Sequence, residues 1–240
     1  LALLPLAAAA AASCRGGDEN PPPPAVHITV DAPDNTNDNT PQITGTSDAP
    51  AGSVVAVLLT DSAGATQTVT TTVQADGSYS VEPSTPLADG AYSAQATVTA
   101  PSGNTASATD TGNIDTTAII TVNAPDLTND NTPLITGTTT DVEAGQTVTV
   151  TITDVNGGTQ VVTTTVQADG SYQIEVPNAL PDGEYTATAK VADKLGNEAQ
   201  ASDPGVVDTT APEITVDVPD HTNDNTPTIT GTTDAPEGSV

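Results

Sequence analysis

The chain has 240 residues, of which 31 are acidic and 3 are basic, giving a formal net charge of −28. Nucleic acids and anionic membrane surfaces are bound through clusters of Lys and Arg, so this composition disfavours both as partners. It favours solubility and the binding of cations.

The apolar composition limits the kind of core that the chain can build. Phe, Trp and Met are absent, and there are only four tyrosines. Each domain must therefore use Val, Ile, Leu and Ala, whose burial contributes roughly 1.5–3 kcal/mol per larger side chain. The single cysteine, Cys14, cannot form an internal disulfide. We expect a thin core that depends on some further stabilising interaction.

The first twelve residues, Leu1 to Ala12, are all apolar or proline and are rich in alanine. The run is too short to span a bilayer, which takes roughly 20 residues, and is typical of the apolar part of a secretory signal. Because neither Met nor a basic leader precedes it, we predict a signal peptide over residues 1–13 that is truncated at its start. Residues 14–25 then form a polar tether stiffened by Pro21 to Pro24.

The end of this segment, Ala11-Ala12-Ser13-Cys14, resembles a bacterial lipobox, although Ala11 replaces the usual Leu. The resemblance implies that Cys14 is acylated and becomes the new N-terminus. No aspartate follows Cys14, which favours the outer membrane as the anchored location. The alternative is ordinary cleavage after a small residue, with Cys14 as an incidental thiol.

Two phrases recur along the rest of the chain at intervals of 92 to 94 residues. Asn-Asp-Asn-Thr-Pro occurs at 37–41, 129–133 and 223–227, and Val-Gln-Ala-Asp-Gly-Ser-Tyr at 73–79 and 166–172. A solenoid repeat spans roughly 20–50 residues, whereas about 100 residues build a complete β-sandwich. The repetition therefore predicts a series of whole domains. They cover residues 26–116, 117–210 and, as an incomplete third domain, 211–240.

Alternation of apolar and polar residues predicts β-strands in these domains. In residues 147–153, Val148, Val150 and Ile152 fall on one side and four threonines on the other. Turns that contain Gly separate such stretches, and no stretch has a convincing helical period. We predict an all-β fold with about seven strands per domain.

The motif Leu-x-Asp-Gly-x-Tyr occurs at residues 87–92 and 180–185. It looks like a tyrosine corner, in which a Tyr hydroxyl bonds the backbone a few residues upstream. We therefore predict a structural role for Tyr92 and Tyr185.

Taken together, these motifs resemble the bacterial Ig-like repeats of large surface adhesins. The likeness covers Val26 to Val240. It rests on Asn-Asp-Asn-Thr-Pro followed by Ile-Thr-Gly-Thr, Ala-Asp-Gly-Ser-Tyr, Leu-x-Asp-Gly-x-Tyr, Asp-Lys-Leu-Gly-Asn at 193–197 and Asp-Thr-Thr-Ala-Pro at 208–212. The resemblance implies tandem Ig-like antiparallel β-sandwiches, often with calcium at the domain junctions. The Cys–Trp–Cys pattern of antibody domains is absent.

Ig topology predicts which loops meet at a junction. The A–B loop and the end of strand G of one domain face the F–G loop of the next. The oxygen-bearing residues of the first junction are Asn37, Asp38, Asn39, Asp115, Asp193 and Asn197. Those of the second are Asn129, Asp130, Asn131 and Asp208. Calcium takes six to eight oxygen ligands, and the lack of His and Cys in both sets argues against zinc.

One difference between the repeats agrees with a junction role. Ala100 stands in the first domain where the second has Asp193, and the top of the first domain faces only the tether. The alternative is that these residues are ordinary turn formers, with Asp-Thr-Thr a simple linker.

Catalytic patterns are absent from the sequence. His27 and His221 have no evident nucleophile or orienting partner, and there is no phosphate-binding loop or Ser–His–Asp array. We therefore predict that the chain is not an enzyme.

These observations predict a non-catalytic extracellular stalk of a bacterial surface lipoprotein. Calcium would make the stalk rigid, and the stalk would project a distal region that attaches cells or biofilm to an unknown surface glycan or protein. One alternative is a set of spacer repeats in a secreted carbohydrate-active enzyme whose catalytic domain lies beyond residue 240. Another is direct binding of glycan or ice by threonine-rich faces such as residues 147–153, although alternating Thr is more often a solvent-facing strand surface.

Overall fold

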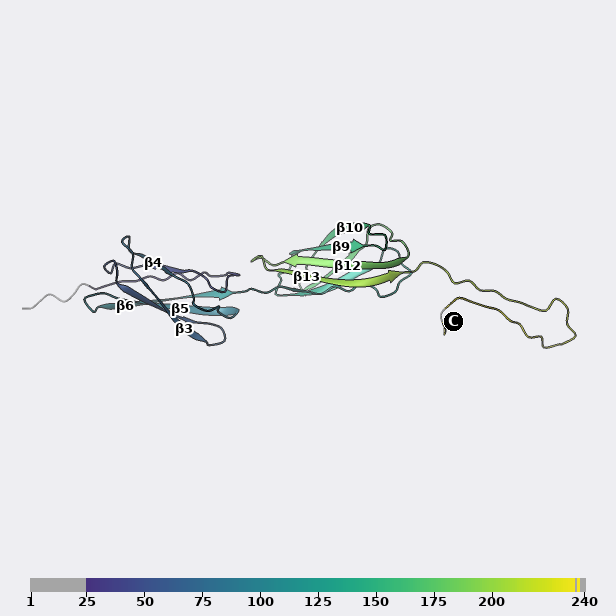
Figure 1. The fold of residues 1–240 in the computed structure, drawn as a ribbon, viewed down its shortest axis with the longest axis horizontal. Helices are drawn as coiled ribbons and strands as arrows, with labels where there is room; N and C mark the ends of the chain where they lie inside the picture. Colours follow the sequence, from purple (N-terminus) through teal and green to yellow (C-terminus); the bar gives the residue numbers. More distant parts are fainter. Residues whose placement is uncertain (1–24, 236, 238–240) are drawn as a thin grey trace, which may run out of the picture. The chain divides into compact units, whose positions relative to one another are not determined.

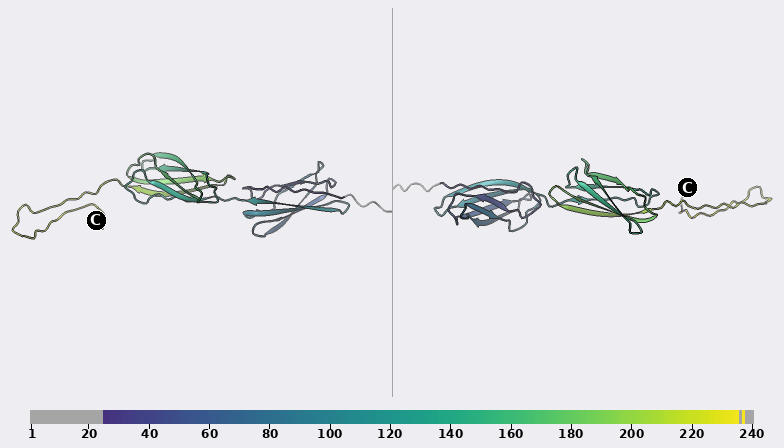
Figure 2. Two further views of the ribbon diagram at one scale, coloured as in Figure 1. Left: turned by 180° about the vertical axis from the view of Figure 1, so that it is seen from behind. Right: turned by 90° about the horizontal axis from the view of Figure 1, so that it is seen from above.

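The computed structural model describes residues 25–235 and 237, and these residues form β-strands and loops (Figures 1 and 2). No helix occurs in this part of the chain, and hence none that could cross a membrane. The prediction of an all-β fold is confirmed. The segment 1–13 and Cys14 lie outside the described residues.

The first repeat contains a two-stranded and a four-stranded sheet (Figure 1). The small sheet pairs β1 (Ile43–Thr46) with β4 (Ser78–Val81). The larger sheet has the order β3 (Thr66–Thr72), β2 (Val54–Thr60), β5 (Gly90–Thr99) and β6 (Thr105–Ile114). The first strand of the repeat is reduced to isolated antiparallel bridges from Ile28 to Ser47 and from Asp31 to Thr44.

The second repeat has the same plan with a three-stranded and a four-stranded sheet. The smaller sheet has the order β11 (Ser171–Glu175), β8 (Leu134–Thr140) and β7 (Ile119–Ile120). The larger has the order β10 (Thr159–Thr165), β9 (Thr147–Thr153), β12 (Gly183–Ala192) and β13 (Glu198–Val207).

The buried face of each strand follows the alternation in the sequence. Val148, Val150 and Ile152 of β9 are 0% exposed, whereas the threonines between them lie at least partly in solvent. Branched aliphatic side chains pack well on a pleated, half-buried surface, and threonine suits the wet face of the same strand. The core of the second repeat is thus a layer of aliphatic side chains completed by Tyr172 and Tyr185.

Tyr172 holds the first strand of the second repeat from inside the core. Its hydroxyl donates to the carbonyl oxygen of Thr121 at 2.5 Å, and its ring lies against Gly137, the residue opposite it in the β11–β8 pair. The first repeat has the same arrangement. There, Tyr79 donates to Thr29 and lies opposite Gly45.

The second tyrosine of each repeat differs from the predicted tyrosine corner. Tyr185 donates to the carbonyl oxygen of Pro125 at 3.4 Å, and Tyr92 to that of Pro33 at 3.2 Å, each about 60 residues upstream. Each acceptor lies two residues after the last bridge of the first strand, beside Gly112 of β6 in the first repeat and Gly205 of β13 in the second. The structural role is as predicted, but the prediction of a nearby acceptor was wrong.

The chain divides into two compact units, which do not coincide with the two repeats. Among the described residues, the first comprises 25–33, Thr40–Pro86 and Tyr92–Gly112. The second comprises Asp34–Asn39, Leu87–Ala91 and the chain from Asn113 onward.

The segment that follows the second repeat forms only the opening bridges of a sandwich. Ile214 bridges to Thr233 and Asp217 to Thr230, in the same pattern as the opening of the first repeat. Its apolar side chains remain in solvent: Ile229 is 60% exposed, whereas the equivalent Ile135 is 0% exposed.

Replacing Gly137 by Ala should destabilise the second repeat. A Cβ at this position would collide with the Thr121 carbonyl oxygen and lie 2.5 Å from the Tyr172 ring. Overpacking of this kind costs about 3 kcal/mol. Gly145→Ala is the control, since nothing lies within 4 Å of its Cβ and only its φ of +90° opposes the change. Urea denaturation of both variants checks this, and equal losses would contradict the packing argument.

Stability should also fall at high pH because of the buried tyrosines. Burial raises the pKa of Tyr79, Tyr172 and Tyr185 to about 12, and for Tyr185 the charge of Asp203 adds to the effect. Since an unfolded Tyr ionises near pH ~10, this contribution is complete below pH ~10 and is lost progressively up to about pH 12. Denaturation midpoints across this range, with tyrosinate absorbance followed in parallel, test the expectation. Tyr172→Phe should make the loss smaller.

Candidate metal centre

The A–B loop of the first repeat is fixed beside the end of β6. Thr36 forms a parallel bridge with Ile114, its backbone N–H donating to Asn113 O at 3.1 Å, and its carbonyl accepts from the Asp115 N–H at 3.0 Å. Asn37, Asp38 and Asn39 follow Thr36 directly in the chain. They therefore lie close to the backbone of Asp115, to which Thr36 is bonded. The A–B loop and the end of strand G (β6), which Ig topology predicted to lie together, are therefore adjacent.

The turn between β12 and β13, which is the F–G turn of Ig topology in the second repeat, contains a buried carboxylate. Asp193 is 6% exposed, and it is the only buried acid among residues 25–235 and 237. One carboxylate oxygen accepts the backbone N–H of Asn197 at 2.8 Å, and the other accepts the Asn197 side-chain amide at 2.8 Å. The turn itself closes through one backbone bond, in which the Asp193 N–H donates to the Asn197 carbonyl oxygen at 3.0 Å.

Asn197 connects this turn to the linker. The same Nδ2 that donates to Asp193 also donates to the carbonyl oxygen of Asp115 at 2.7 Å. Asn37 lies close by, since a Cβ built on Gly196 would be 3.9 Å from its Nδ2. The second compact unit thus gathers four of the six predicted first-junction residues, namely Asn37, Asp115, Asp193 and Asn197.

The other two predicted residues serve the loop around them. The N–H of Asp38 donates to the Thr36 hydroxyl at 3.0 Å, and the Asn39 carbonyl accepts from Leu87 N–H at 2.8 Å. The Asp115 side chain accepts the Thr117 N–H at 3.2 Å, so it is the backbone of Asp115 that faces Asn197.

No basic side chain neutralises Asp193 in the described part of the chain. Lys194 lies near Glu143, with Nζ 3.9 Å from the carboxylate, and Lys190 pairs with Glu198 at 2.8 Å. A buried carboxylate that has only amide donors is costly. The turn does not need a carboxylate in order to form. In the equivalent turn of the first repeat, the Ala100 N–H donates to the Asn104 carbonyl oxygen at 2.9 Å.

The residues predicted for the second junction follow the same backbone plan. Thr128 pairs with the end of β13, and its carbonyl accepts the Asp208 N–H at 2.9 Å. Asp130 accepts the N–H and hydroxyl of Thr132 at 2.9 and 3.0 Å, and Asp208 accepts the Thr210 N–H at 3.1 Å. These two carboxylates cap turns, and the backbone carbonyl of Asn131 accepts from Leu180 at 2.8 Å.

The donor set at Asp193 fits a hard cation in chemistry. Its residues carry carboxylate, amide and carbonyl groups, whose oxygens Ca²⁺ and Mg²⁺ prefer over the nitrogen and sulfur ligands of zinc. Asn197 points its amide nitrogen at Asp193 and Asp115, so it would have to turn its amide oxygen inward to bind a cation. Within the described residues, however, no three side chains of His, Cys, Asp or Glu come together as a metal site. An ion at this place would therefore rely on carbonyl and amide oxygens as well as on Asp193.

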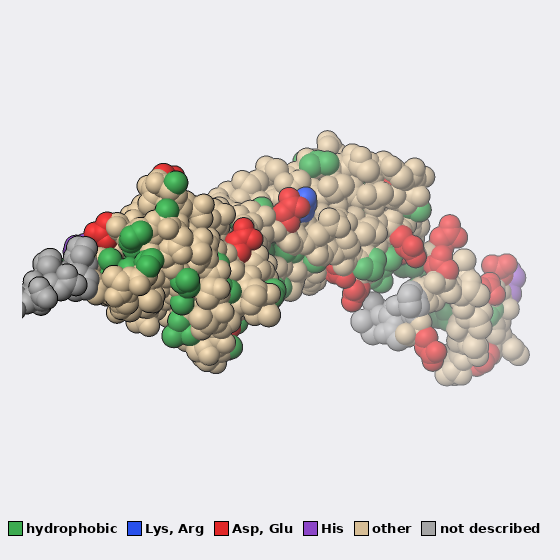
Figure 3. Space-filling model, turned by 60° about the vertical axis from the view of Figure 1, so that its left-hand side comes forward, with side chains coloured by type: hydrophobic (Ala, Val, Ile, Leu, Met, Phe, Trp, Pro, Cys, Tyr) green, Lys and Arg blue, Asp and Glu red, His purple; other side chains and the backbone are tan. Residues whose placement is uncertain are grey.

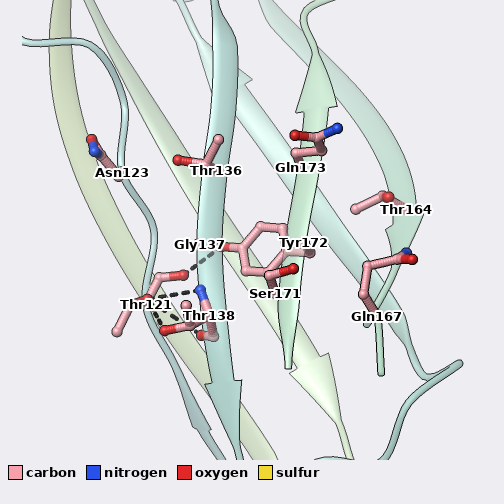
Figure 4. A pocket seen from close by; sticks show the side chains of 10 residues that line it. All are labelled: Thr121, Asn123, Thr136, Gly137, Thr138, Thr164, Gln167, Ser171, Tyr172 and Gln173. Carbon is pink, nitrogen blue, oxygen red and sulfur yellow. Dashed lines mark hydrogen bonds between the residues drawn. The ribbon is translucent and has the colours of Figure 1, made fainter. Parts of the chain in front are cut away.

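A polar groove marks the outer face of the smaller sheet in the second repeat (Figure 4). Its lining is hydroxyl and amide, with Asn123, Gln167 and Gln173 at the rim and Thr121 bonded to Thr138 at 2.9 Å. The equivalent groove of the first repeat has Asp31 in place of Asn123. Neither groove pairs a nucleophile with a base.

One prediction about His27 needs correction. The imidazole Nδ1 lies 2.8 Å from the Asp48 carboxylate, so this histidine does have an orienting partner. The pair is exposed, and these bonds keep the pKa of Asp48 below its ordinary value, mainly through the His27 backbone N–H. The nearby Ser47 hydroxyl donates to the His27 backbone carbonyl at 2.6 Å and does not face the ring, so no catalytic triad forms.

The surface matches the composition. On the face that Figure 3 shows, acidic side chains form small separate groups on a largely uncharged surface, and basic side chains are scarce. Most Asp and Glu residues of the described chain lie outside the strands, in turns and linkers.

Two of the similar solved structures are parts of adhesion proteins. A tetra-tandem repeat from the extending region of a large adhesion protein is 35% identical, covers 87% of this chain and 56% of its own, and gives a TM-score of 0.41. A Ca²⁺-stabilized adhesin that helps an Antarctic bacterium reach out and bind ice is 29% identical, covers 81% of this chain and 52% of its own, and gives 0.43. The chain thus spans about half the length of either structure. No curated protein sequence matches it.

The sequence profile of the bacterial Ig-like domain matches the chain twice, over residues 29–116 and 121–209. The two matches cover both sandwiches and most of the chain. The chain therefore belongs to the bacterial Ig-like domain family, with two copies in tandem.

Proposed function

We propose that this chain is a segment of the extracellular stalk of a bacterial surface adhesin. The tandem Ig-like repeats and the sequence identity of 35% to an adhesin's extending region support this role. The stalk is non-catalytic, and it projects a distal region that attaches the cell or a biofilm to a surface glycan or protein. Its net charge of −28 keeps such a stalk soluble and away from nucleic acid.

In this proposal, calcium at Asp193 makes the junction rigid. The observation that carries it is the single buried acid of the described chain, which sits without a basic partner in a turn that closes equally well around Ala100. Asp193, Asn197, Asn37 and the carbonyl of Asp115 would hold the ion, with Asp38 and Asn39 in the adjoining loop. The second junction would use Asn129, Asp130, Asn131 and Asp208 in the same way.

A bound calcium ion would supply positive charge that offsets the buried carboxylate and attracts oxygens of both loops. Asn197 already draws an Asp193 oxygen and the Asp115 carbonyl oxygen to within 2.8 Å of one nitrogen atom. The amide thus does in part what a cation would do more strongly. The similar Antarctic adhesin is described as Ca²⁺-stabilized, which agrees with this proposal.

The stalk is anchored, we further propose, in the outer membrane through acylated Cys14. The apolar segment before Cys14 and the proline-rich tether after it support this anchor. Mass spectrometry of the protein from a membrane fraction would show the added lipid, and an unmodified Cys14 thiol would contradict it.

Calcium should raise the melting temperature of the chain and reduce bending between its repeats. Saturating a site at about a hundred times its dissociation constant adds about 2.7 kcal/mol, which corresponds to a rise of roughly 11–22 °C in the melting temperature of a domain of up to about 100 residues. Thermal melts and small-angle X-ray scattering of the full chain, with calcium and with excess chelator, measure both effects.

Asp193→Asn should abolish most of the calcium effect, since it removes the buried charge and keeps the shape. Asp115→Asn tests whether the side chain takes part in addition to the backbone carbonyl. Asp76→Asn, which alters an exposed turn carboxylate of the first repeat, is the matched control. If calcium changes neither the melting temperature nor the scattering profile of the wild-type chain, the acidic loops are solvated turns and the calcium proposal fails.

A further inference from the structure

The linker after the second repeat is bonded to a carboxylate of the body. Asp182, in the turn that leads into β12, accepts the Thr209 N–H at 3.0 Å and the Thr209 hydroxyl at 2.7 Å on one oxygen. Its other oxygen accepts the Thr210 hydroxyl at 2.9 Å. All three donors belong to the Asp-Thr-Thr segment that leaves the repeat.

The first repeat forms the first part of this contact, with Thr116 in place of Thr209, whereas the Thr117 hydroxyl donates to Asp115 and Asp141 at 3.5 Å. Asp89 accepts the Thr116 N–H at 3.2 Å and its hydroxyl at 2.9 and 3.0 Å. In both repeats 27 residues separate the carboxylate from the first threonine of the linker. The contact between the carboxylate and the first threonine of the linker therefore recurs in both repeats.

We propose that Asp89 and Asp182 are positioning residues that clamp the start of each linker to its own repeat and so set the direction in which the chain leaves it. The clamp works without a metal ion. The clamp is distinct from the proposed calcium site, because its acceptors are the carboxylates of Asp89 and Asp182, which are not among the proposed calcium ligands.

The turn that carries the clamp is itself firmly held. Leu180 and Tyr185, on either side of Asp182, are buried, and the Leu180 N–H donates to Asn131 at 2.8 Å. The linker is held from its other side as well, because the Asp208 N–H donates to Thr128 at 2.9 Å. Bonds to the body from two directions fix a short segment far better than one bond does, since each restricts a different backbone rotation.

The donors explain the choice of residues in the linker. A threonine offers a backbone N–H and a hydroxyl to one carboxylate, and hydrogen bonds to a charged acceptor are about twice as strong as neutral ones. The Thr209 hydroxyl, followed by its N–H and the Thr210 hydroxyl, lowers the pKa of Asp182 below its ordinary value. Asp-Thr-Thr is thus a segment shaped to bind the Asp-Gly turn of its own repeat.

Amide hydrogen exchange and ¹⁵N relaxation of the full chain in excess chelator test the clamp. In Asp182→Ala, exchange at Thr209 should become roughly tenfold faster, as expected for the loss of a hydrogen bond to a charged group. The heteronuclear NOE of residues 208–211 should fall. Asp169→Ala is the matched control, because Asp169 accepts the N–H and hydroxyl of Ser171 in a similar Asp-Gly turn that does not touch the linker.

Thr209→Val provides a second variant that keeps the carboxylate and the shape of the linker while removing the hydroxyl. It should lower the same NOEs by a smaller amount, and it decides the question if Asp182→Ala does not fold. Unchanged exchange and NOEs at the linker in the folded variants would overturn the clamp. Because chelator is present throughout, this result is independent of whether calcium binds at Asp193.

Discussion

Two tyrosine hydroxyls in each repeat hold a first strand that has little pairing of its own. In the second repeat this strand pairs through the two residues of β7 and an isolated bridge, yet its carbonyls at Thr121 and Pro125 both accept bonds from the core. The rings reach those carbonyls because Gly137 and Gly205 leave room above them. In a core without Phe, Trp or Met, these rings also provide the bulk that aliphatic side chains cannot.

The position of the first strand determines where the functional loops lie. Once Pro125 is fixed against Tyr185, the chain continues to Thr128, which pairs with the end of β13 and bonds the Asp208 backbone. Asp208 is the first residue of the linker, and the next two residues, Thr209 and Thr210, donate hydrogen bonds to Asp182. Core packing, loop placement and linker direction are therefore successive consequences of one strand being held in place.

The elements that could be predicted from the sequence are those that depend on local pattern. The alternation of apolar and polar residues around Val148 predicts both a strand and which of its faces is buried. The repeated sequence motifs predict the tandem organisation. The contacts that were missed or misplaced depend on which strands come together. Tyr185 meets Pro125, Asp182 meets Thr209, and His27 meets Asp48, each across 20 to 60 residues of chain. No local pattern contains such a pairing, because strand order and register alone decide it.

The acidic residues of this chain have different structural roles, although they carry the same charge. Asp169 serves its own turn, and Asp182 holds the linker, each with N–H and hydroxyl donors that satisfy an exposed carboxylate. Asp193 differs because it is buried and its donors are the backbone N–H and side-chain amide of one asparagine. The turn closes without this charge, as Ala100 shows, and burying a carboxylate carries a desolvation cost that the alanine avoids. In the proposed function a cation offsets that cost at Asp193, whereas the clamp at Asp182 needs none, and the two divide the control of the linkers between them.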